Sequence, residues 1–320
     1  MNKRILLAAT VALTLSSAQA QINRADPSGY FERATAMFET GNYAGCLDQM
    51  TEALRLDKDA SFAEDARFYI ALSAARQGRP DALSLLEQFS RDYPASPRRG
   101  IVTMATGDIF YDRGDVTTAL HHYLSVDPST LDGIRSEDYR YRLAYCRLMK
   151  NDRDDAGRLY RTLETTRRYG NDAMFYLGYI DYADGDYDEA LARFRKVVPE
   201  TSGPTSMTDF YLGQIYYMRR DYDKALTTSR RLLSLDGIGS EFRAEAARVA
   251  GESCYSLDRP DEAVTLLKQY VSLTDSPLPS ALYVLGLSEY RTGDYLRAID
   301  DLTPVTKQDN AMGQSAYLLI

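Results

Sequence analysis

The sequence has few of the residues that usually carry catalysis, redox chemistry or metal binding. Its 320 residues include no tryptophan, two histidines and three cysteines. His121 and His122 are adjacent, so on a helix their side chains point in different directions and do not make a chelating pair. We therefore expect no metal site and no cofactor.

The three cysteines do not suggest a disulfide framework. Cys46, Cys146 and Cys254 are about a hundred residues apart, and an odd number cannot all pair within one chain. Cys46 also stands at a position where other parts of the chain place alanine. We expect small buried side chains here rather than a disulfide or a reactive thiol.

Recognisable catalytic motifs are missing as well. The glycines are spread singly along the chain and form no phosphate-binding loop, and neither histidine belongs to a Ser-His-Asp set. Acidic pairs such as Asp154-Asp155 and Asp188-Glu189 fit the first turn of a helix, where they stabilise the helix dipole. The sequence therefore predicts a protein that is not an enzyme.

Positive charge is scarce, and this bears on the choice of partner. The formal net charge is −8. Proteins that bind nucleic acid or anionic membranes usually present an excess of Lys and Arg, so both partners are disfavoured. After residue 20 no apolar run is long enough to cross a bilayer.

Residues 1–20 form a segment with the features of a signal peptide. Lys3 and Arg4 precede an apolar run over residues 5–15, and Ala18 and Ala20 are the small residues that a signal peptidase accepts. We expect cleavage after Ala20, which leaves residues 21–320 as the mature chain. The protein is then exported, to the periplasm or the medium.

The remainder of the chain repeats one pattern. "YLGYIDYADGDYDEALARF" begins at Tyr176, "YLGQIYYMRRDYDKALTTS" at Tyr211 and "VLGLSEYRTGDYLRAIDDL" at Val284. A period of about 35 residues is typical of a helical solenoid. Eight copies can be aligned on one small residue: Cys46, Ala82, Ala119, Ala156, Ala190, Ala225, Ala263 and Ala298.

Each copy predicts two helices separated by a tight break. A residue in the left-handed conformation ends the first helix, and an Asn or Asp after it caps the second. Pro80 and Pro260 suit the first position of the second helix. The breaks are Gly41, Gly78, Gly114, Gly185 and Gly293, with Asn151, Arg220 and Asp258 in place of glycine; the capping residues are Asn42, Asp115, Asp152, Asp186, Asp221 and Asp294.

Small residues recur on the first helix too. We expect them to face the aligned alanines of the second helix, so that the two helices approach closely. They are Ala71, Gly107, Ala144, Gly178, Gly213, Gly251 and Gly286.

These Leu-Gly, Gly-Asp-Tyr and Ala motifs, over about residues 27–320, resemble the tetratricopeptide repeat. The resemblance implies an all-α, right-handed superhelix of antiparallel helix pairs whose first helices line a concave binding surface. The sequence departs from the family in having no early Trp, and its closing Pro is clear only at Pro94.

The end of the chain predicts the start of a ninth repeat. Residues 317–320 would begin another first helix, and Leu318, Leu319 and Ile320 lack the second helix that would cover them. We expect the array to continue beyond residue 320 or to pack on another molecule here.

Aromatic residues recur on one face of the first helices, which predicts an aromatic ladder for a protein or peptide partner. Nearby acids (Asp108, Asp112, Asp138 and Glu252, against Arg248 and Arg291) favour neutral or basic segments. The predicted partner-binding residues are Phe68, Tyr111, Tyr141, Tyr145, Phe175, Tyr179, Tyr182, Phe210, Tyr217, Tyr255, Tyr283 and Tyr290.

Other interpretations of this pattern stay open. The same rings could serve only to pack neighbouring copies together, or could stack on envelope carbohydrate. The array could also be the docking arm of a longer enzyme. The sequence identifies neither the partner nor the oligomeric state.

Overall fold

The computed structural model describes residues 26–200 and 203–320, and in this part of the chain the regular structure is helical, with no strand. The predicted signal segment lies outside the described residues. None of the described helices is long and apolar enough to span a membrane. The chain divides between Leu159 and Tyr160 into two compact units, which are treated separately.

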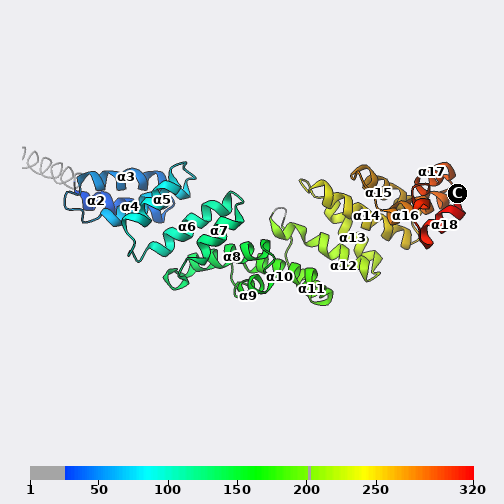
Figure 1. Cartoon of the computed structure of the whole chain (residues 1–320), viewed down its shortest axis with the longest axis horizontal. Helices are drawn as coiled ribbons and strands as arrows, with labels where there is room; N and C mark the ends of the chain where they lie inside the picture. The colour runs from blue at the N-terminus through cyan, green and yellow to red at the C-terminus, as the bar shows by residue number, and fades with distance from the viewer. Residues whose placement is uncertain (1–25, 201–202) are drawn as a thin grey trace, which may run out of the picture. The chain divides into compact units, whose positions relative to one another are not determined.

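The first unit contains three complete helix pairs and the first helix of a fourth (Figure 1). The second helix of the fourth pair, α9 (Arg153–Arg161), spans the division between the units. The helices of the first unit are α2 (Pro27–Glu39), α3 (Tyr43–Leu56), α4 (Ala63–Arg76), α5 (Ala82–Asp92), α6 (Arg99–Asp112), α7 (Val116–Leu124) and α8 (Gly133–Met149).

The second unit contains four helix pairs and one further helix, so the eight predicted pairs are present together with a ninth first helix. That helix begins at Ala311 and not at Tyr317 as predicted, so Tyr317 and Leu318 lie in its last turn. The helices are α10 (Gly170–Asp184), α11 (Tyr187–Phe194), α12 (Thr208–Met218), α13 (Tyr222–Leu233), α14 (Ser240–Ser256), α15 (Pro260–Ser272), α16 (Pro279–Thr292), α17 (Tyr295–Leu302) and α18 (Ala311–Leu319).

The two helices of a pair run antiparallel, as α10 and α11 illustrate. Near the turn the rings of Tyr182 and Tyr187 are 5.5 Å apart. At the far end Asn171 exchanges two 2.9 Å hydrogen bonds with the backbone of Val198, just beyond α11. Consecutive helices also make contact, as α5 does with α6 in the first unit and α13 with α14 in the second. First helices of successive pairs touch as well: α4 with α6, and α12 with α14. The all-α solenoid is thus confirmed; its right-handed sense stays a prediction.

Every predicted break adopts the left-handed conformation. The five glycines have φ between 63° and 89°, and Asn151, Arg220 and Asp258 have φ of 62°, 61° and 62°. The three departures from glycine therefore keep the repeat geometry and accept the backbone strain that an L-residue meets there.

The predicted N-caps are confirmed in part. Asn42, Asp115, Asp152 and Asp294 accept a hydrogen bond from the backbone N–H three residues later, at 3.0 to 3.4 Å. Asp186 and Asp221 make no such bond. Pro260 opens α15 as predicted, but the assignment of Pro80 was wrong, because α5 begins at Ala82 and Pro80 lies in the preceding turn.

The predicted partner of the first-helix glycines was wrong by one helical turn. A Cβ built on Gly286 would lie 2.5 Å from Cγ of Leu302, four residues after Ala298, and 3.3 Å from the Ala298 carbonyl oxygen. Gly251 meets Leu267 in the same way, at 2.6 Å. The leucine side chain of the second helix thus packs against the glycine of the first helix. The aligned alanine, one turn earlier, is small enough for the backbone of the second helix to lie close to the first helix.

The aligned small residues themselves lie in the core. Cys46 and Ala190 are fully buried, and Ala298 is 3% exposed. All three cysteines are buried and unpaired, as expected. Burial raises the pKa of the Cys146 thiol to about 11, which suppresses the reactive thiolate.

The last helix leaves part of its surface uncovered. Tyr317 and Leu318 are 71% and 84% exposed, whereas Leu319 packs against Leu302 and Val305 of the preceding repeat. The expected apolar patch is therefore present, with Leu319 excepted. Continuation of the array past residue 320 stays a prediction.

We predict that Gly286→Ala destabilises the protein, because the added methyl group would collide with Leu302 and the Ala298 backbone. The loss should be about 1–3 kcal/mol, measured by thermal unfolding. Gly133→Ala is the control: Gly133 is the first residue of α8, and no atom lies within 4 Å of a Cβ built on it. Equal midpoints for the two variants would contradict the packing described here. Adding Leu302→Ala should offset part of the Gly286→Ala loss.

Candidate functional site

The best-defined surface feature is a series of tyrosines on the first helices, three residues before the break. They belong to α6, α10, α12, α14 and α16, one in each. All are partly exposed, and Tyr290 reaches 47%. We call this set the tyrosine series: Tyr111, Tyr182, Tyr217, Tyr255 and Tyr290.

Two of the predicted contact residues are in the core instead. Phe68 is 4% exposed and Phe175 is 5% exposed. Phe175 packs against Phe194 of its own second helix at 5.7 Å and against Tyr211 of the next first helix at 5.9 Å. Because these rings fill the space between helices, they are unavailable to a partner.

The other predicted rings remain at least partly accessible. Tyr141 and Tyr145 lie on α8, Tyr179 on α10, Phe210 on α12 and Tyr283 on α16. Tyr145 meets Tyr111 of α6 edge-on at 5.4 Å, so rings of successive first helices touch within the first unit. This is the contact that a ladder requires.

Within the second unit the structure adds two rings that the sequence pattern missed. Tyr211 of α12 lies 5.7 Å from Tyr179 and 5.1 Å from Tyr182, and so bridges the rings of α10. Phe242 of α14 lies 5.1 Å from Phe210 and is 37% exposed. Tyr211 immediately follows Phe210 in sequence, and adjacent residues of a helix point in different directions, so a pattern based on one helix face did not include it.

Arginines from the next first helix cover three members of the tyrosine series. Arg142 lies 5.1 Å from the ring of Tyr111, and Arg248 lies 5.6 Å from that of Tyr217. Arg291 has the same relation to Tyr255, at 5.6 Å. Such cation–π contacts help to hold each ring in place.

Arg142 was not predicted, although the sequence held a signal for it. Arg142 follows Tyr111 at the same interval at which Arg248 follows Tyr217. Its guanidinium lies 2.9 Å from Asp108 and 3.7 Å from Asp112. The acids that were expected to face a partner are therefore already paired with an arginine.

The same neutralisation occurs in the second unit. Arg248 lies 2.8 Å from the buried Glu252 and also pairs with Glu245, and the hydroxyl of Tyr217 donates to Glu252. The expected preference for basic segments is accordingly weak, since little uncompensated acid remains on this face.

Tyr111 and Tyr217 of the tyrosine series stay protonated at physiological pH. Burial raises the pKa of Tyr111 to about 12, and burial together with the bond to Glu252 raises the pKa of Tyr217. Each partly exposed ring thus offers an apolar edge and a neutral hydroxyl, which can donate or accept a hydrogen bond.

No metal site accompanies these rings in residues 26–200 and 203–320, where no group of three His, Cys, Asp or Glu side chains could hold an ion. The adjacent histidines have separate surroundings. His122 stacks on Phe110 at 5.5 Å, with the rings 6° from parallel, while His121 is exposed.

Comparison with known families agrees with this geometry. Tetratricopeptide repeat profiles match residues 65–96, 141–206, 210–277 and 250–303, which together span more than half of the chain. The chain belongs to the tetratricopeptide repeat family. No curated protein sequence gives a match.

Solved tetratricopeptide repeat structures resemble the chain at low sequence identity. A tetratricopeptide repeat protein from Parabacteroides merdae is 16% identical, with a TM-score of 0.48 over 80% of this chain and 97% of that one. The Pseudomonas aeruginosa protein pilF is 14% identical, with a TM-score of 0.49 over 68% of this chain and 95% of its own.

One tetratricopeptide repeat of this chain contains an unusual buried acid next to the tyrosine series. Glu289, which precedes Tyr290, is fully buried, and its carboxylate lies 2.7 Å from Nζ of Lys268. Asp301 of α17 lies beside it. At the matching positions of an earlier repeat Asp181 pairs with Arg193 at 2.7 Å, so an acid has replaced the base in the last repeat.

We predict that Glu289 makes stability depend on pH. Burial, and then Asp301, raise the pKa of Glu289. The folded chain therefore holds this proton more tightly than the unfolded chain, and the resulting stability is lost as pH rises through the raised pKa. Glu289→Gln should be more stable than the wild type near pH 8, with the difference shrinking toward pH 4.

Chemical unfolding at several pH values checks this expectation. Asp300→Asn is the control, because it removes an exposed carboxylate from the same helix as Asp301. The raised pKa of Glu289 would be contradicted if the difference in stability between the wild type and Glu289→Gln were the same at every pH.

Proposed function

We propose that the protein is a non-catalytic scaffold that binds a protein or peptide through the tyrosine series and its neighbouring rings. Tetratricopeptide repeat proteins are generally interaction scaffolds. The observation that carries the proposal is the recurrence of a partly exposed tyrosine at one position of five first helices. Rings of this kind give a large contact area at low cost in side-chain entropy.

The ion pairs on this face indicate how a partner would be recognised. Arg142 and Arg248 are both matched by acids and both hold a tyrosine ring. A partner would therefore gain little from charge. It would be held by apolar side chains against ring edges and by hydrogen bonds to tyrosine hydroxyls.

We predict that replacing Tyr182, Tyr217 and Tyr290 together by serine abolishes partner capture and leaves the chain folded. The measurement is a quantitative pull-down with the full chain, comparing proteins retained by wild type and variant. Circular dichroism confirms that the variant keeps its helices.

The matched control is a second triple serine variant at Tyr187, Tyr222 and Tyr295. These tyrosines open the second helices of the same three repeats and contact the first set one for one. Both variants lose the same three ring contacts, and the first variant also loses the contact of Tyr182 with Tyr211 and the bond of Tyr217 to Glu252. Circular dichroism must therefore show that both variants keep their helices before their pull-downs are compared. Retention of the same partners by both variants, or equal loss by both, would argue against the tyrosine series as the binding face.

Export to the periplasm or the medium is part of this proposal. It is supported by the basic start, apolar run and small residues of positions 1–20. We predict that the mature protein begins at Gln21, and N-terminal sequencing of protein from the envelope fraction measures this. A chain that retains Met1 in the cell interior would rule out export by this segment.

A further inference from the structure

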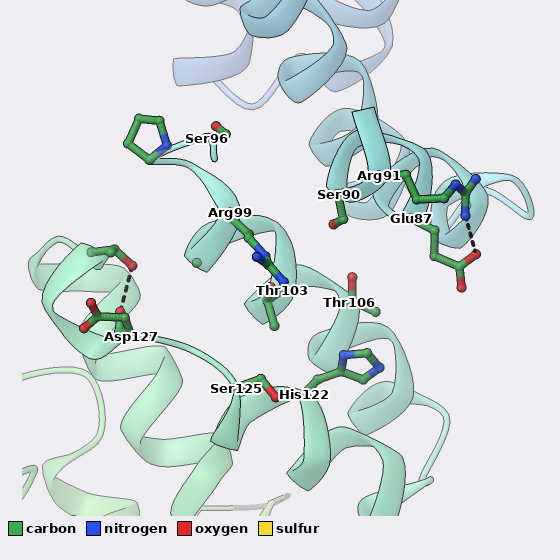
Figure 2. Close-up of a pocket in the computed structure, with 13 residues that line it drawn as sticks. Glu87, Ser90, Arg91, Ser96, Arg99, Thr103, Thr106, His122, Ser125 and Asp127 are labelled. Atoms are coloured by element: carbon green, nitrogen blue, oxygen red, sulfur yellow. Dashed lines mark hydrogen bonds and ion pairs between the residues drawn. The ribbon is translucent and has the colours of Figure 1, made fainter. Parts of the chain in front are cut away.

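A second candidate site lies in the first unit, and no member of the tyrosine series lines it. A cavity of about 670 Å³ opens between α5, α6, α7 and the short 3-10 helix η1 (Pro128–Thr130) (Figure 2). None of the twelve predicted aromatic residues lines it. Six hydroxyl side chains do: Ser90, Ser96, Thr103, Thr106, Ser125 and Thr130.

Most of these hydroxyls have already donated their hydrogen. Ser90, Thr106 and Ser125 each donate to the carbonyl oxygen one turn earlier on their own helix, at 3.0 Å. A hydroxyl in this state still has acceptor lone pairs. This wall of the cavity is therefore suited to a ligand that brings hydrogen-bond donors.

The hydroxyls at the two ends of the cavity have also donated their hydrogen, and Ser96 in addition accepts from the backbone N–H of Arg98 at 3.1 Å. Ser96 donates to the Glu64 carboxylate at 2.7 Å, and Thr130 donates to the Asp127 carbonyl at 2.7 Å. Thr130 also packs directly on the backbone of Gly100, where a Cβ would lie 2.1 Å from its Oγ1. Gly100 thus lets η1 close this end of the cavity.

Arg99 is a cation of the cavity with N–H donors that are not used in hydrogen bonds to the described residues. Figure 2 shows the Arg99 side chain extending across the cavity toward Thr103. Its guanidinium donates to the Pro94 carbonyl at 3.3 Å, and within the described ranges no carboxylate lies at ion-pair distance from it. Arg91, by contrast, is paired with Glu87 at 3.8 Å.

Two carboxylates, Glu87 and Asp127, also line the cavity, and each has partners of its own. Asp127 turns Oδ1 to its own loop, where it accepts from the backbone and hydroxyl of Ser129 at 3.0 and 2.8 Å. Burial lowers the pKa of His122, so its imidazole is neutral near pH 7 and offers one donor and one acceptor.

We propose that this cavity binds an acidic sugar, whose ring hydroxyls donate to the serine and threonine oxygens and whose carboxylate or phosphate accepts from Arg99. A bare inorganic anion would leave the row of acceptors unused. A neutral sugar would leave Arg99 unmatched. The volume falls within the range of small-molecule sites in proteins.

The test is isothermal titration calorimetry of the full chain with four probes: glucuronate, glucose 6-phosphate, glucose and inorganic phosphate. Glucuronate or glucose 6-phosphate should bind at least about tenfold more tightly than the other two. The stronger of the two identifies a carboxylate or a phosphate as the acidic group. Equal binding of glucose, or binding of phosphate alone, would overturn the proposal, as would no binding of either acidic sugar at millimolar concentration.

Two variants localise the binding. Arg99→Gln should weaken binding of the acidic sugar about tenfold or more. Thr103→Val should weaken it without affecting the fold, because among the described residues the Thr103 hydroxyl has no hydrogen-bond partner. Arg113→Gln is the control, since Arg113 is exposed at the end of the same helix and lies outside the cavity. Unchanged affinity in Arg99→Gln would place any binding elsewhere.

This inference is independent of the proposed function. The variant with serine at Tyr182, Tyr217 and Tyr290 should bind the acidic sugar as the wild type does, because those residues belong to the second unit. Loss of sugar binding in that variant would move the ligand to the tyrosine series and overturn the assignment to the cavity.

Discussion

The close approach of the two helices in each pair is the constraint on which the other features depend. Gly286 and Gly251 leave space on the first helix for a leucine from the second, at distances where a Cβ would collide. The alanine one turn earlier brings the second-helix backbone close enough for that leucine to reach. Dense packing of this kind tolerates little added volume, so small residues recur at these positions along the chain.

This packing also fixes where side chains outside the core can go. Once a pair closes, the first helix contacts the first helix of the next pair, as α12 does with α14. Tyr217 and Arg248 then pack together across that contact. Glu252 accepts a hydrogen bond from the Tyr217 hydroxyl and forms an ion pair with Arg248. The ring is therefore held by its neighbours before any partner arrives, which reduces the entropy that binding must overcome.

Much of this fold could be predicted from the sequence because its main determinants are local. Most breaks are marked by glycine, which readily adopts positive φ. The others were predicted from their position in the repeat, and one of them, Arg220, adopts φ of 61°. The core positions follow from helical periodicity. What the sequence did not predict was the partner of each glycine, since the offset of one turn between facing helices depends on three-dimensional packing.

The candidate site was less predictable for a related reason. Phe175 shares the sequence spacing of the exposed rings, but it lies between two helices and is buried. Spacing assigns a residue to a face of its own helix, whereas exposure depends on what the neighbouring helices cover. The pairing of Asp108 with Arg142 could not be predicted from helical spacing either, because it joins two helices of different repeats.

The two candidate surfaces illustrate how a repeat array separates recognition from stability. The tyrosine series uses one position of the repeat, and within the second unit it offers similar contacts on the successive first helices α10, α12, α14 and α16. The cavity beside Arg99 draws on residues such as Ser90, Ser125 and Thr130, which share no repeat position, and it exists only where η1 closes one end. Repetition therefore suits an extended partner, whereas a local departure from repetition suits a compact ligand. Because each repeat packs chiefly on its neighbours, such a departure can form in one repeat without disturbing those farther along the chain.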